Sequence, residues 1–394
     1  MTYDNRRKWQ LHAEAAEVFT PGAPVDHLTL FAGRMEQVKD VLNAVTYRGQ
    51  HVILFGERGV GKTSLANVLQ ELFASRTMAL EFVKVNCNTG DDFYELWRKV
   101  FRELGVTDPD EVPVTPEDVR FALRERQSES ALVVIFDELD RLENEEVLSL
   151  LADTIKTLSD YSLPVTVVLV GVADSIDQLI ADHASVSRAL IQVQMPRMSE
   201  KELMEIIDNG CEQLRLSTES AARTRIARLS EGLPHYTHAL SLHASQRTIL
   251  DYRQEITWAD VSAATRETVK KAEHTIQNVY RFATRSPHKG NLFPQVLLAC
   301  ALAPKDELGY FKASDVREPM SLIMGKKYDI PAFARHLSAF TNSDRGAVLQ
   351  KSGTEYRYFY RFENPLLQPY VIMRGLAKNL ISDELLRALQ GPVE

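Results

Sequence analysis

The hydrophobic pattern of the chain changes near residue 199. Before that point, continuous apolar runs separated by helical patterns predict five strands, at residues 51–55, 79–86, 131–136, 164–171 and 189–195. Runs such as residues 132–136 and 165–170 are typical of strands buried on both faces of a parallel sheet. The prediction is a doubly wound α/β fold, whose ligand lies at the carboxyl ends of the strands.

After residue 199 the periodicity is helical, which predicts a small helical lid of four helices at residues 199–214, 217–230, 234–250 and 258–271. Two of these helices begin with a cap signal. Ser199 and Thr257 are each followed three positions later by an acidic residue, as in a capping box. A cluster of helix breakers at residues 286–290 then indicates a linker or turn.

The last third of the chain has the element order of a winged helix domain. We expect helices at residues 292–302, just after 313–315, and at 330–340, then strands at 347–351 and 355–362 joined by Ser352, Gly353 and Thr354. Residues 330–340 occupy the place of the recognition helix. The second strand alternates between an aromatic face and a mostly basic face, formed by Tyr356, Tyr358, Tyr360 and Phe362 on one side and Arg357, Phe359 and Arg361 on the other. The aromatic face is expected to pack on the helices, with base stacking as the alternative.

These patterns predict four segments: an N-terminal extension (1–27), an α/β core (28–198), the helical lid (199–274) and the winged-helix-like domain (275–394). With 394 residues, 44% hydrophobic and 25% charged, the composition is that of a globular protein. Neither a signal sequence nor a membrane span is evident, so we expect a soluble, cytoplasmic protein without a membrane partner. Cys87, Cys211 and Cys300 are far apart and indicate neither a disulfide framework nor a zinc site.

Charge is distributed unevenly along the chain. Residues 275–394 contain 16 Lys and Arg against 11 Asp and Glu, a net of +5, so residues 1–274 carry −13 of a total that is −8. A basic C-terminal module suits phosphate backbones, and a solvated surface explains the same excess equally well.

A complete phosphate loop follows the first strand and is formed by Gly56, Glu57, Arg58, Gly59, Val60, Gly61, Lys62 and Thr63, with Ser64 directly after it. In such a loop, glycines let backbone N–H groups surround phosphate oxygens, Lys62 reaches the β and γ phosphates, and the Thr63 hydroxyl binds Mg²⁺. An amphipathic helix follows, with an apolar face of Leu65, Val68, Leu69, Leu72 and Phe73. Its N-terminus faces the phosphates, so the chain is expected to bind a nucleoside triphosphate.

The third strand ends in two adjacent carboxylates, Asp137 and Glu138. Opposite a phosphate loop, Asp137 is expected to hold Mg²⁺ and Glu138 to polarise the water that attacks the γ phosphorus. Acids that merely form a turn are the alternative.

Taken together, these motifs resemble those of AAA+ ATPases, nearest to the origin-recognition-type and STAND-like branches. The resemblance implies ATP rather than GTP as the nucleotide. It implies that Gly33 and Arg34 lie near the adenine pocket, with a simple turn as the alternative for Gly33. It places Asp174 at the sensor 1 position, where the family usually has Asn or Thr, so that Asp174 would work through water or metal.

The resemblance implies roles for four further residues. Arg188, before the fifth strand, matches an arginine finger that reaches into a neighbouring subunit, and an ordinary surface cation is the alternative. Asn86 matches the polar residue that in this family can hold the catalytic glutamate inactive. Pro234 and His235 stand where many relatives have a sensor 2 arginine; the alternative is that Pro234 starts a helix and His235 faces solvent.

The sequence thus predicts an AAA+ ATPase that binds and hydrolyses Mg-ATP to control its assembly into a homo-oligomer. The first hypothesis for its partner is duplex DNA, contacted through Arg335, Arg357 and Arg361. The alternative is a STAND-like signalling or anti-phage defence switch, whose winged helix domain binds a protein partner. A nucleotide-gated scaffold without hydrolysis is a third interpretation, which Glu138 argues against.

Overall fold

The computed structural model describes residues 3–25, 27–74, 80–106, 113–126, 130–172, 186–288, 290–354 and 357–390. The chain forms two compact units. One, here called the sheet unit, comprises Pro24–Glu57 and Gly61–Pro196, and the other, the helical unit, comprises Met1–Ala23, Arg58–Val60 and Arg197–Glu394. Within the described ranges, no helix combines the length and the apolar character needed to cross a membrane.

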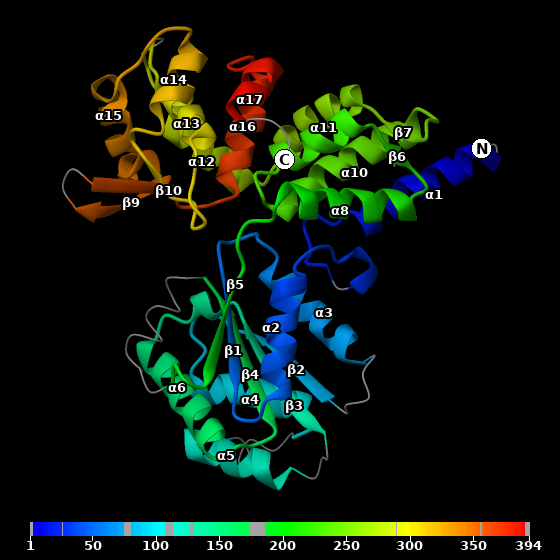
Figure 1. Ribbon diagram of the computed structural model, residues 1–394, viewed down its shortest axis with the longest axis vertical. Helices are drawn as coiled ribbons and strands as arrows, with labels where there is room; N and C mark the ends of the chain where they lie inside the picture. Colours follow the sequence, from blue (N-terminus) through cyan, green and yellow to red (C-terminus); the bar gives the residue numbers. More distant parts are fainter. Residues whose placement is uncertain are drawn as a thin grey trace. The chain divides into compact units, whose positions relative to one another are not determined.

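The sheet unit is built on five parallel strands in the order β2-β3-β4-β1-β5 (Figure 1). Their bounds are β1 (His51–Phe55), β2 (Leu80–Asn86), β3 (Ala131–Asp137), β4 (Val165–Gly171) and β5 (Leu190–Gln194). The five predicted strands and the doubly wound α/β class are confirmed, while Ala79 lies outside the described residues. Because β1 sits inside the sheet between β4 and β5, its carboxyl end opens next to that of β4.

Helices cover both faces of this sheet (Figure 1). They are α2 (Met35–Thr46), α3 (Lys62–Ala74), α4 (Phe93–Glu103), α5 (Pro116–Glu125) and α6 (Glu145–Asp160), with short 3-10 turns η1 (Leu28–Leu30) and η3 (Leu139–Arg141). One face packs on α4, α5 and α6 around the fully buried Trp97, whose ring meets that of Phe136 at 5.5 Å. The other face packs on α2 and α3. Strand residues alternate between these two cores, which explains the unbroken apolar runs.

The helical unit begins with α1 (Tyr3–Val18), a helix that the sequence analysis did not predict. It packs on α10 within a set formed by α8 (Glu200–Gln213), α9 (Ser220–Leu229), α10 (Pro234–Leu250) and α11 (Trp258–Lys271), with a two-stranded parallel sheet of β6 (Ser217–Thr218) and β7 (Glu255–Ile256). Phe19 follows α1 and is buried so close to Gly210 that an added Cβ would lie 2.4 Å from its ring. Glycine at position 210 therefore admits Phe19.

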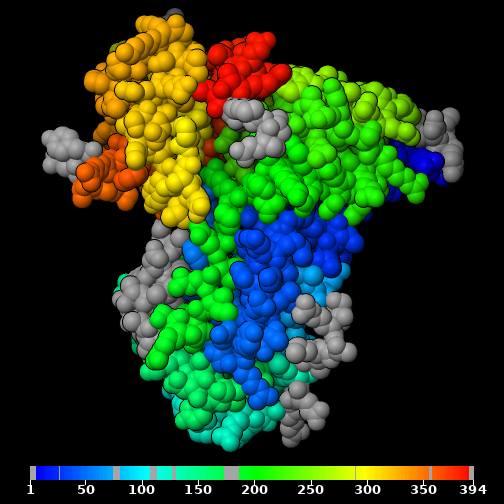
Figure 2. Space-filling view, in the orientation of Figure 1, coloured from blue at the N-terminus to red at the C-terminus, as the bar shows by residue number. Residues whose placement is uncertain are grey.

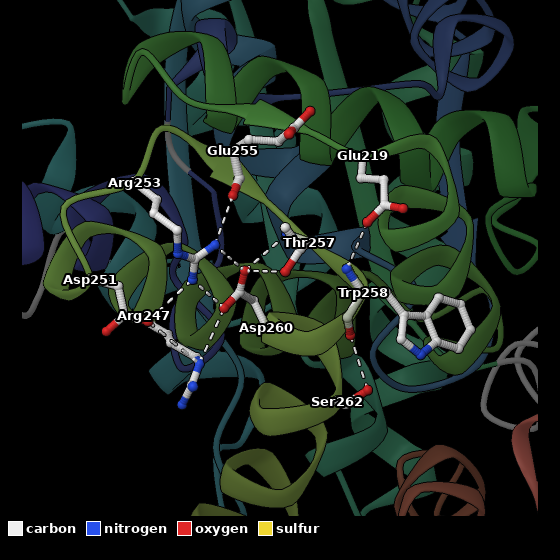
Figure 3. A network of polar contacts seen from close by, with 9 residues as sticks. All are labelled: Glu219, Arg247, Asp251, Arg253, Glu255, Thr257, Trp258, Asp260 and Ser262. Atoms are coloured by element: carbon white, nitrogen blue, oxygen red, sulfur yellow. Dashed lines mark hydrogen bonds and ion pairs between the residues drawn. The ribbon is translucent and has the colours of Figure 1, made fainter.

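Both predicted cap signals are confirmed as capping boxes, at Ser199 with Glu202 and at Thr257 with Asp260. The second belongs to a larger polar network between α10 and α11 (Figure 3). Asp260, 1% exposed, accepts hydrogen bonds from the backbone and hydroxyl of Thr257 and from Arg253, and Arg247 lies 3.2 Å away. Burial raises the pKa of Asp260, but the hydrogen bonds from Arg253 and Thr257 outweigh burial and hold it at about 2.

The C-terminal part of the helical unit has the predicted order of helices followed by a hairpin. Its elements are α12 (His274–Thr284), α13 (Phe293–Leu302), β8 (Phe311–Lys312), α14 (Arg317–Met324), α15 (Ile330–Phe340), η4 (Ser343–Arg345), β9 (Leu349–Thr354), β10 (Arg357–Phe362), α16 (Leu367–Ala377) and α17 (Asp383–Gln390). The strands form an antiparallel sheet in the order β8-β10-β9, and β9 and β10 lie at the surface in Figure 2.

The hairpin differs from the prediction in its turn. Ser352, Gly353 and Thr354 were expected to connect the strands, but they belong to β9, and Thr354 pairs with Arg357. The error arose because glycine is a typical turn residue; Gly353 has a positive φ of +95° but pairs with Tyr358 inside the ladder. Of the expected aromatic face, Tyr360 and Phe362 are buried beside Phe311 on β8, Tyr358 is half-buried, and Tyr356 lies outside the described residues. The packing of this face on the helices stays a prediction.

Candidate nucleotide site

The phosphate loop connects β1 to the first turn of α3. Gly59 and Gly61 have φ of +87° and +95°, in the left-handed region where a side chain is strained. Gly56 has no room for one, since an added Cβ would lie 2.2 Å from the carbonyl oxygen of Met195. α3 begins at Lys62, so its free N–H groups and positive dipole end point into the loop. The backbone therefore has the form that a phosphate group requires.

Lys62 folds back into this loop. Its ammonium donates hydrogen bonds to the carbonyl oxygens of Gly56, at 3.0 Å, and Glu57, at 2.8 Å. The positive charge is thereby kept within the concave side of the loop. Among the other loop residues, Val60 is 1% exposed, Arg58 is exposed, and the Ser64 hydroxyl accepts a hydrogen bond from the backbone of Val25.

The Thr63 hydroxyl and the Asp137 carboxylate come together from α3 and β3. Thr63 Oγ1 lies 3.3 Å from Asp137 Oδ1, which also accepts the backbone N–H of Glu138 at 2.9 Å. Asp137 is 2% exposed, and its second oxygen, Oδ2, is buried without a hydrogen bond in the described structure. Two residues 74 positions apart thus present hard oxygen ligands at one point.

A lysine that the sequence analysis did not consider also reaches this carboxylate. Lys84 on β2 places its Nζ 3.0 Å from Asp137 Oδ2 and donates a 2.6 Å hydrogen bond to Asn67 Oδ1 on α3. The contact with Oδ2 has ion-pair distance but not the alignment of a hydrogen bond. The sequence feature that could have identified Lys84 is a lysine within an otherwise apolar stretch of β2, which is the strand beside the one that carries the acids.

Glu138 lies directly after β3 with a φ of +60°, a strained value for a residue with a side chain. Its carboxylate is about half exposed and accepts a 3.0 Å hydrogen bond from Arg141 Nη1, within η3. Asn86, expected to contact Glu138, pairs with Asp137 in the backbone register, and its carbonyl accepts from Lys99. Arg141, not Asn86, is the residue that the structure shows on the Glu138 carboxylate.

The donor set at this point fits a magnesium nucleotide. Mg²⁺ prefers oxygen ligands and usually takes only one or two carboxylates together with phosphate oxygens and water. Thr63 Oγ1 and the under-bonded Asp137 Oδ2 are ligands of that kind, and they lie beside a loop shaped for phosphate. The residues present therefore suit both parts of such a ligand.

Gly33 and Arg34 lie in the sheet unit, where they form the backbone turn at the start of α2. Both have positive φ, at +66° and +63°, and Arg34 is the N-cap residue of α2. The Arg34 guanidinium is buried and donates a 2.7 Å hydrogen bond to the carbonyl of Pro196. Arg34 thus ties the start of α2 to the chain after β5, and its contact with adenine stays a prediction.

Arg188 is exposed in the turn before β5, and its role as an arginine finger stays a prediction. Asp174 lies outside the described residues. Pro234 and His235 belong to the helical unit, where Pro234 occupies the first turn of α10. A ring nitrogen of His235 lies 2.7 Å from the Pro21 carbonyl, and burial lowers the pKa of this histidine. Their roles as nucleotide contacts remain predictions.

Comparison with known proteins agrees with this geometry. Residues 45–180 match the family model described as AAA domain. A curated relative, the ORC1-type DNA replication protein 1 of Halobacterium salinarum, is 31% identical over 113 residues, or 28% of this chain. The match spans 37% of that relative, about a third of its length.

Two solved structures share the fold over nearly the whole chain. The Aeropyrum pernix ORC2 protein, with ADPNP and ADP, has a TM-score of 0.55 and 16% identity, with 95% of this chain and 98% of that chain covered. The Aeropyrum pernix ORC1 protein in complex with DNA has a TM-score of 0.51 and 15% identity, covering 92% and 97%. The expected resemblance to origin-recognition-type AAA+ ATPases is confirmed.

Proposed function

We propose that this chain binds and hydrolyses Mg-ATP and uses the nucleotide cycle to control its assembly into a homo-oligomer. The observation that carries the proposal is the convergence of Lys62, Thr63 and Asp137 at a loop with the geometry of a phosphate cradle. A structure of the Aeropyrum pernix ORC2 protein with ADPNP and ADP supports the choice of an adenine nucleotide.

In this proposal each residue has a separate task. Lys62 and the N-terminal N–H groups of α3 bind the β and γ phosphates. Thr63 and Asp137 hold Mg²⁺, which when bound neutralises charge on the phosphate oxygens. Glu138 leaves Arg141 and orients the attacking water as a general base. Arg188 of a neighbouring copy adds positive charge near the γ phosphate, which makes hydrolysis depend on assembly.

Two substitutions test the nucleotide chemistry. Lys62→Ala should abolish binding of ATP and ADP, measured by calorimetry at physiological Mg²⁺. Glu138→Gln should keep binding and remove most turnover, because the amide is no base. Wild-type protein that gives no heat with any adenine nucleotide would disprove the proposal.

We further propose that the C-terminal part of the helical unit contacts duplex DNA. Arg335 on α15 and Lys351 and Arg357 on the hairpin are exposed. Arg361 is less suited, because it donates a 2.5 Å hydrogen bond to Gln350 and lies over the Tyr310 ring. The DNA complex of the Aeropyrum pernix ORC1 protein supports this part of the proposal.

The salt dependence of binding measures this contact. Binding of the full chain to a labelled duplex should weaken steeply with salt, with a slope of about −0.9 for each neutralised phosphate. The double substitution Arg335→Ala/Arg357→Ala should reduce that slope by about 2. A Lys201→Ala variant, on α8, serves as the control for loss of surface charge. Absence of binding even at low salt would contradict the DNA proposal.

One observation favours a protein partner as a second candidate. Apart from Arg335, the exposed positions of α15 are small and uncharged, namely Pro331, Ala332, Ala334 and Ser338. A recognition helix for DNA normally presents several polar side chains to base edges. A complex with a protein that survives high salt, together with no DNA binding, would favour the signalling-switch alternative.

A further inference from the structure

The ion pair between Lys84 and Asp137 lies where the proposed metal site needs a free carboxylate. Asp137 is 2% exposed, and a buried carboxylate is costly unless a cation accompanies it. Lys84 Nζ, at 3.0 Å, supplies that cation from the neighbouring strand. In the backbone register Lys84 pairs with Ile135, two residues before Asp137, so both side chains project from the same face of the sheet.

The ammonium of Lys84 is itself held in place. It donates a 2.6 Å hydrogen bond to Asn67 Oδ1, on the helix that begins at Lys62. Asn67 is four residues after Thr63 and so lies one turn further along α3, on the side of Thr63. Lys84 therefore bridges β3, which carries the acid, and α3, which carries the proposed phosphate and metal ligands.

The two oxygens of Asp137 are occupied in different ways. Oδ1 accepts from Glu138 N and faces the Thr63 hydroxyl, whereas Oδ2 has Lys84 as a charge partner but no aligned hydrogen bond. An oxygen held by charge without directed bonding is available to a second cation. The arrangement offers the same carboxylate oxygen to an internal ammonium and to an incoming metal ion.

We propose that Lys84 is the resident counter-cation of Asp137, and that it sets how strongly nucleotide binding depends on Mg²⁺. This inference rests on the proposed nucleotide function. Without a bound nucleotide, Lys84 neutralises the buried carboxylate and keeps α3 and β3 together. With Mg²⁺-nucleotide, two cations share one carboxylate, and their repulsion lowers the affinity for the metal. Lys84 is a positioning residue, since it acts through Asp137.

The first test is thermal unfolding of the full chain with EDTA, with ADP and EDTA, and with ADP and Mg²⁺. Lys84→Met should unfold several degrees below wild type in EDTA, because Asp137 is left buried without a counter-charge. With Mg²⁺ and ADP, the difference in unfolding temperature between Lys84→Met and wild type should fall to less than half of its value in EDTA. In an Asp137→Asn background, Lys84→Met should lower the unfolding temperature only slightly in any of the three conditions, because no charge remains to be neutralised.

The second test measures affinity by titrating Mg²⁺ against fluorescent ADP. The gain in ADP affinity that Mg²⁺ causes should be roughly tenfold larger in Lys84→Met than in wild type, as expected when a nearby like charge is removed. Lys84→Gln, which keeps a hydrogen-bond donor for Asn67 but has no charge, should behave like Lys84→Met. It also replaces Lys84→Met if that variant does not fold.

The matched control is Lys99→Met. Lys99 has the same exposed fraction as Lys84, 26%, and a comparable ion pair, with Asp91. Its stability loss should be equal with and without Mg²⁺-ADP. If Lys84 variants lose the same stability in all three conditions and show the wild-type Mg²⁺ dependence, Lys84 is only structural and the inference is wrong. If wild type itself gains no stability from Mg²⁺-ADP, the proposed nucleotide function fails first, and the inference with it.

Discussion

At the scale of single residues, the two acidic side chains of the site each form an ion pair within the protein itself. Asp137 pairs with Lys84 inside the protein, whereas Glu138 pairs with Arg141 at a surface where both side chains are 47% exposed. Exposed ion pairs contribute about 0–1 kcal/mol because water screens them. The two adjacent acids are therefore restrained very differently, although they are neighbours in sequence.

The weak pair leads to a prediction about turnover. Arg141→Ala should free Glu138 from a restraint of at most about 1 kcal/mol, so steady-state ATP turnover should rise by no more than about fivefold. ADP affinity should be unchanged. Arg102→Ala, on α4, is the control. A fall in turnover to the level of Glu138→Gln would show instead that Arg141 is needed for hydrolysis.

A second residue-scale prediction concerns acid stability. Burial lowers the pKa of His51 to about 4, below its usual 6.5, and its Nδ1 accepts the backbone N–H of Val167. The folded state thus binds the proton less readily than the unfolded state. Stability from this residue is fully present above pH 6.5 and declines as the pH falls toward 4, by at most about 3 kcal/mol.

Urea unfolding at several pH values between 7.5 and 4 measures this effect. His51→Asn keeps a hydrogen-bond acceptor but does not titrate, so it should show a shallower decline than wild type. His288→Asn, at an exposed position, should follow wild type. Equal pH dependence of all three proteins would contradict the assignment to His51.

At the scale of elements, a short polar network joins two successive helices. The network around Asp260 joins the end of α10, β7 and the start of α11 through Arg253, Arg247 and Thr257 (Figure 3). The capping box was visible in the sequence, because its two residues are three positions apart. The arginines were not, since their contact depends on how the loop at residues 251–256 folds.

From this network we expect a clear loss of stability for a substitution of the buried Asp260 and almost none for a substitution of the exposed Asp251. Asp260→Asn should reduce the free energy of unfolding by about 2 kcal/mol, because the buried hydrogen bonds to Arg253 lose their charge. Asp251→Asn, at a 49% exposed position with the same arginine, should cost less than about 1 kcal/mol. Urea unfolding at pH 7 measures both. Because the pKa of Asp260 is held at about 2, its contribution should disappear only as the pH falls from about 4 to 2.

At the scale of the whole molecule, the proposed function needs more than one copy of the chain. Arg188 is exposed and precedes β5, whose residue Leu190 pairs with His51 at the start of β1, so Arg188 lies at the edge of the sheet opposite the phosphate loop. Its predicted role is therefore in a neighbouring subunit. A single guanidinium supplied in this way contributes about 10³-fold or more to phosphoryl transfer in known systems.

Mixing two inactive variants tests this role. Arg188→Ala alone should keep ADP affinity and lose most turnover. Glu138→Gln alone should also be inactive, although its Arg188 is intact. If Arg188 acts on a neighbouring pocket, mixing the two should restore part of the wild-type turnover at concentrations where the chains assemble. Unchanged kinetics of Arg188→Ala, or no recovery in the mixture, would remove the finger assignment.

The sequence by itself determined the five parallel strands, the phosphate loop before α3, and the capping boxes at Ser199 and Thr257. These features depend on local periodicity or on residue types at fixed spacing, which short-range sterics and hydrogen bonding translate directly into structure.

The tertiary structure decided the partners of charged side chains. Lys84 meets Asp137 because β2 lies beside β3, and Arg141 rather than Asn86 holds Glu138 because the backbone after β3 turns through a positive φ. It also decided where β9 ends, since Gly353 pairs with Tyr358 inside the ladder despite the turn preference of glycine. The contact of Lys84 with Asp137 joins segments distant in sequence and depends on the packing of the whole unit, whereas that of Arg141 with Glu138 spans three positions and depends on the backbone conformation after β3.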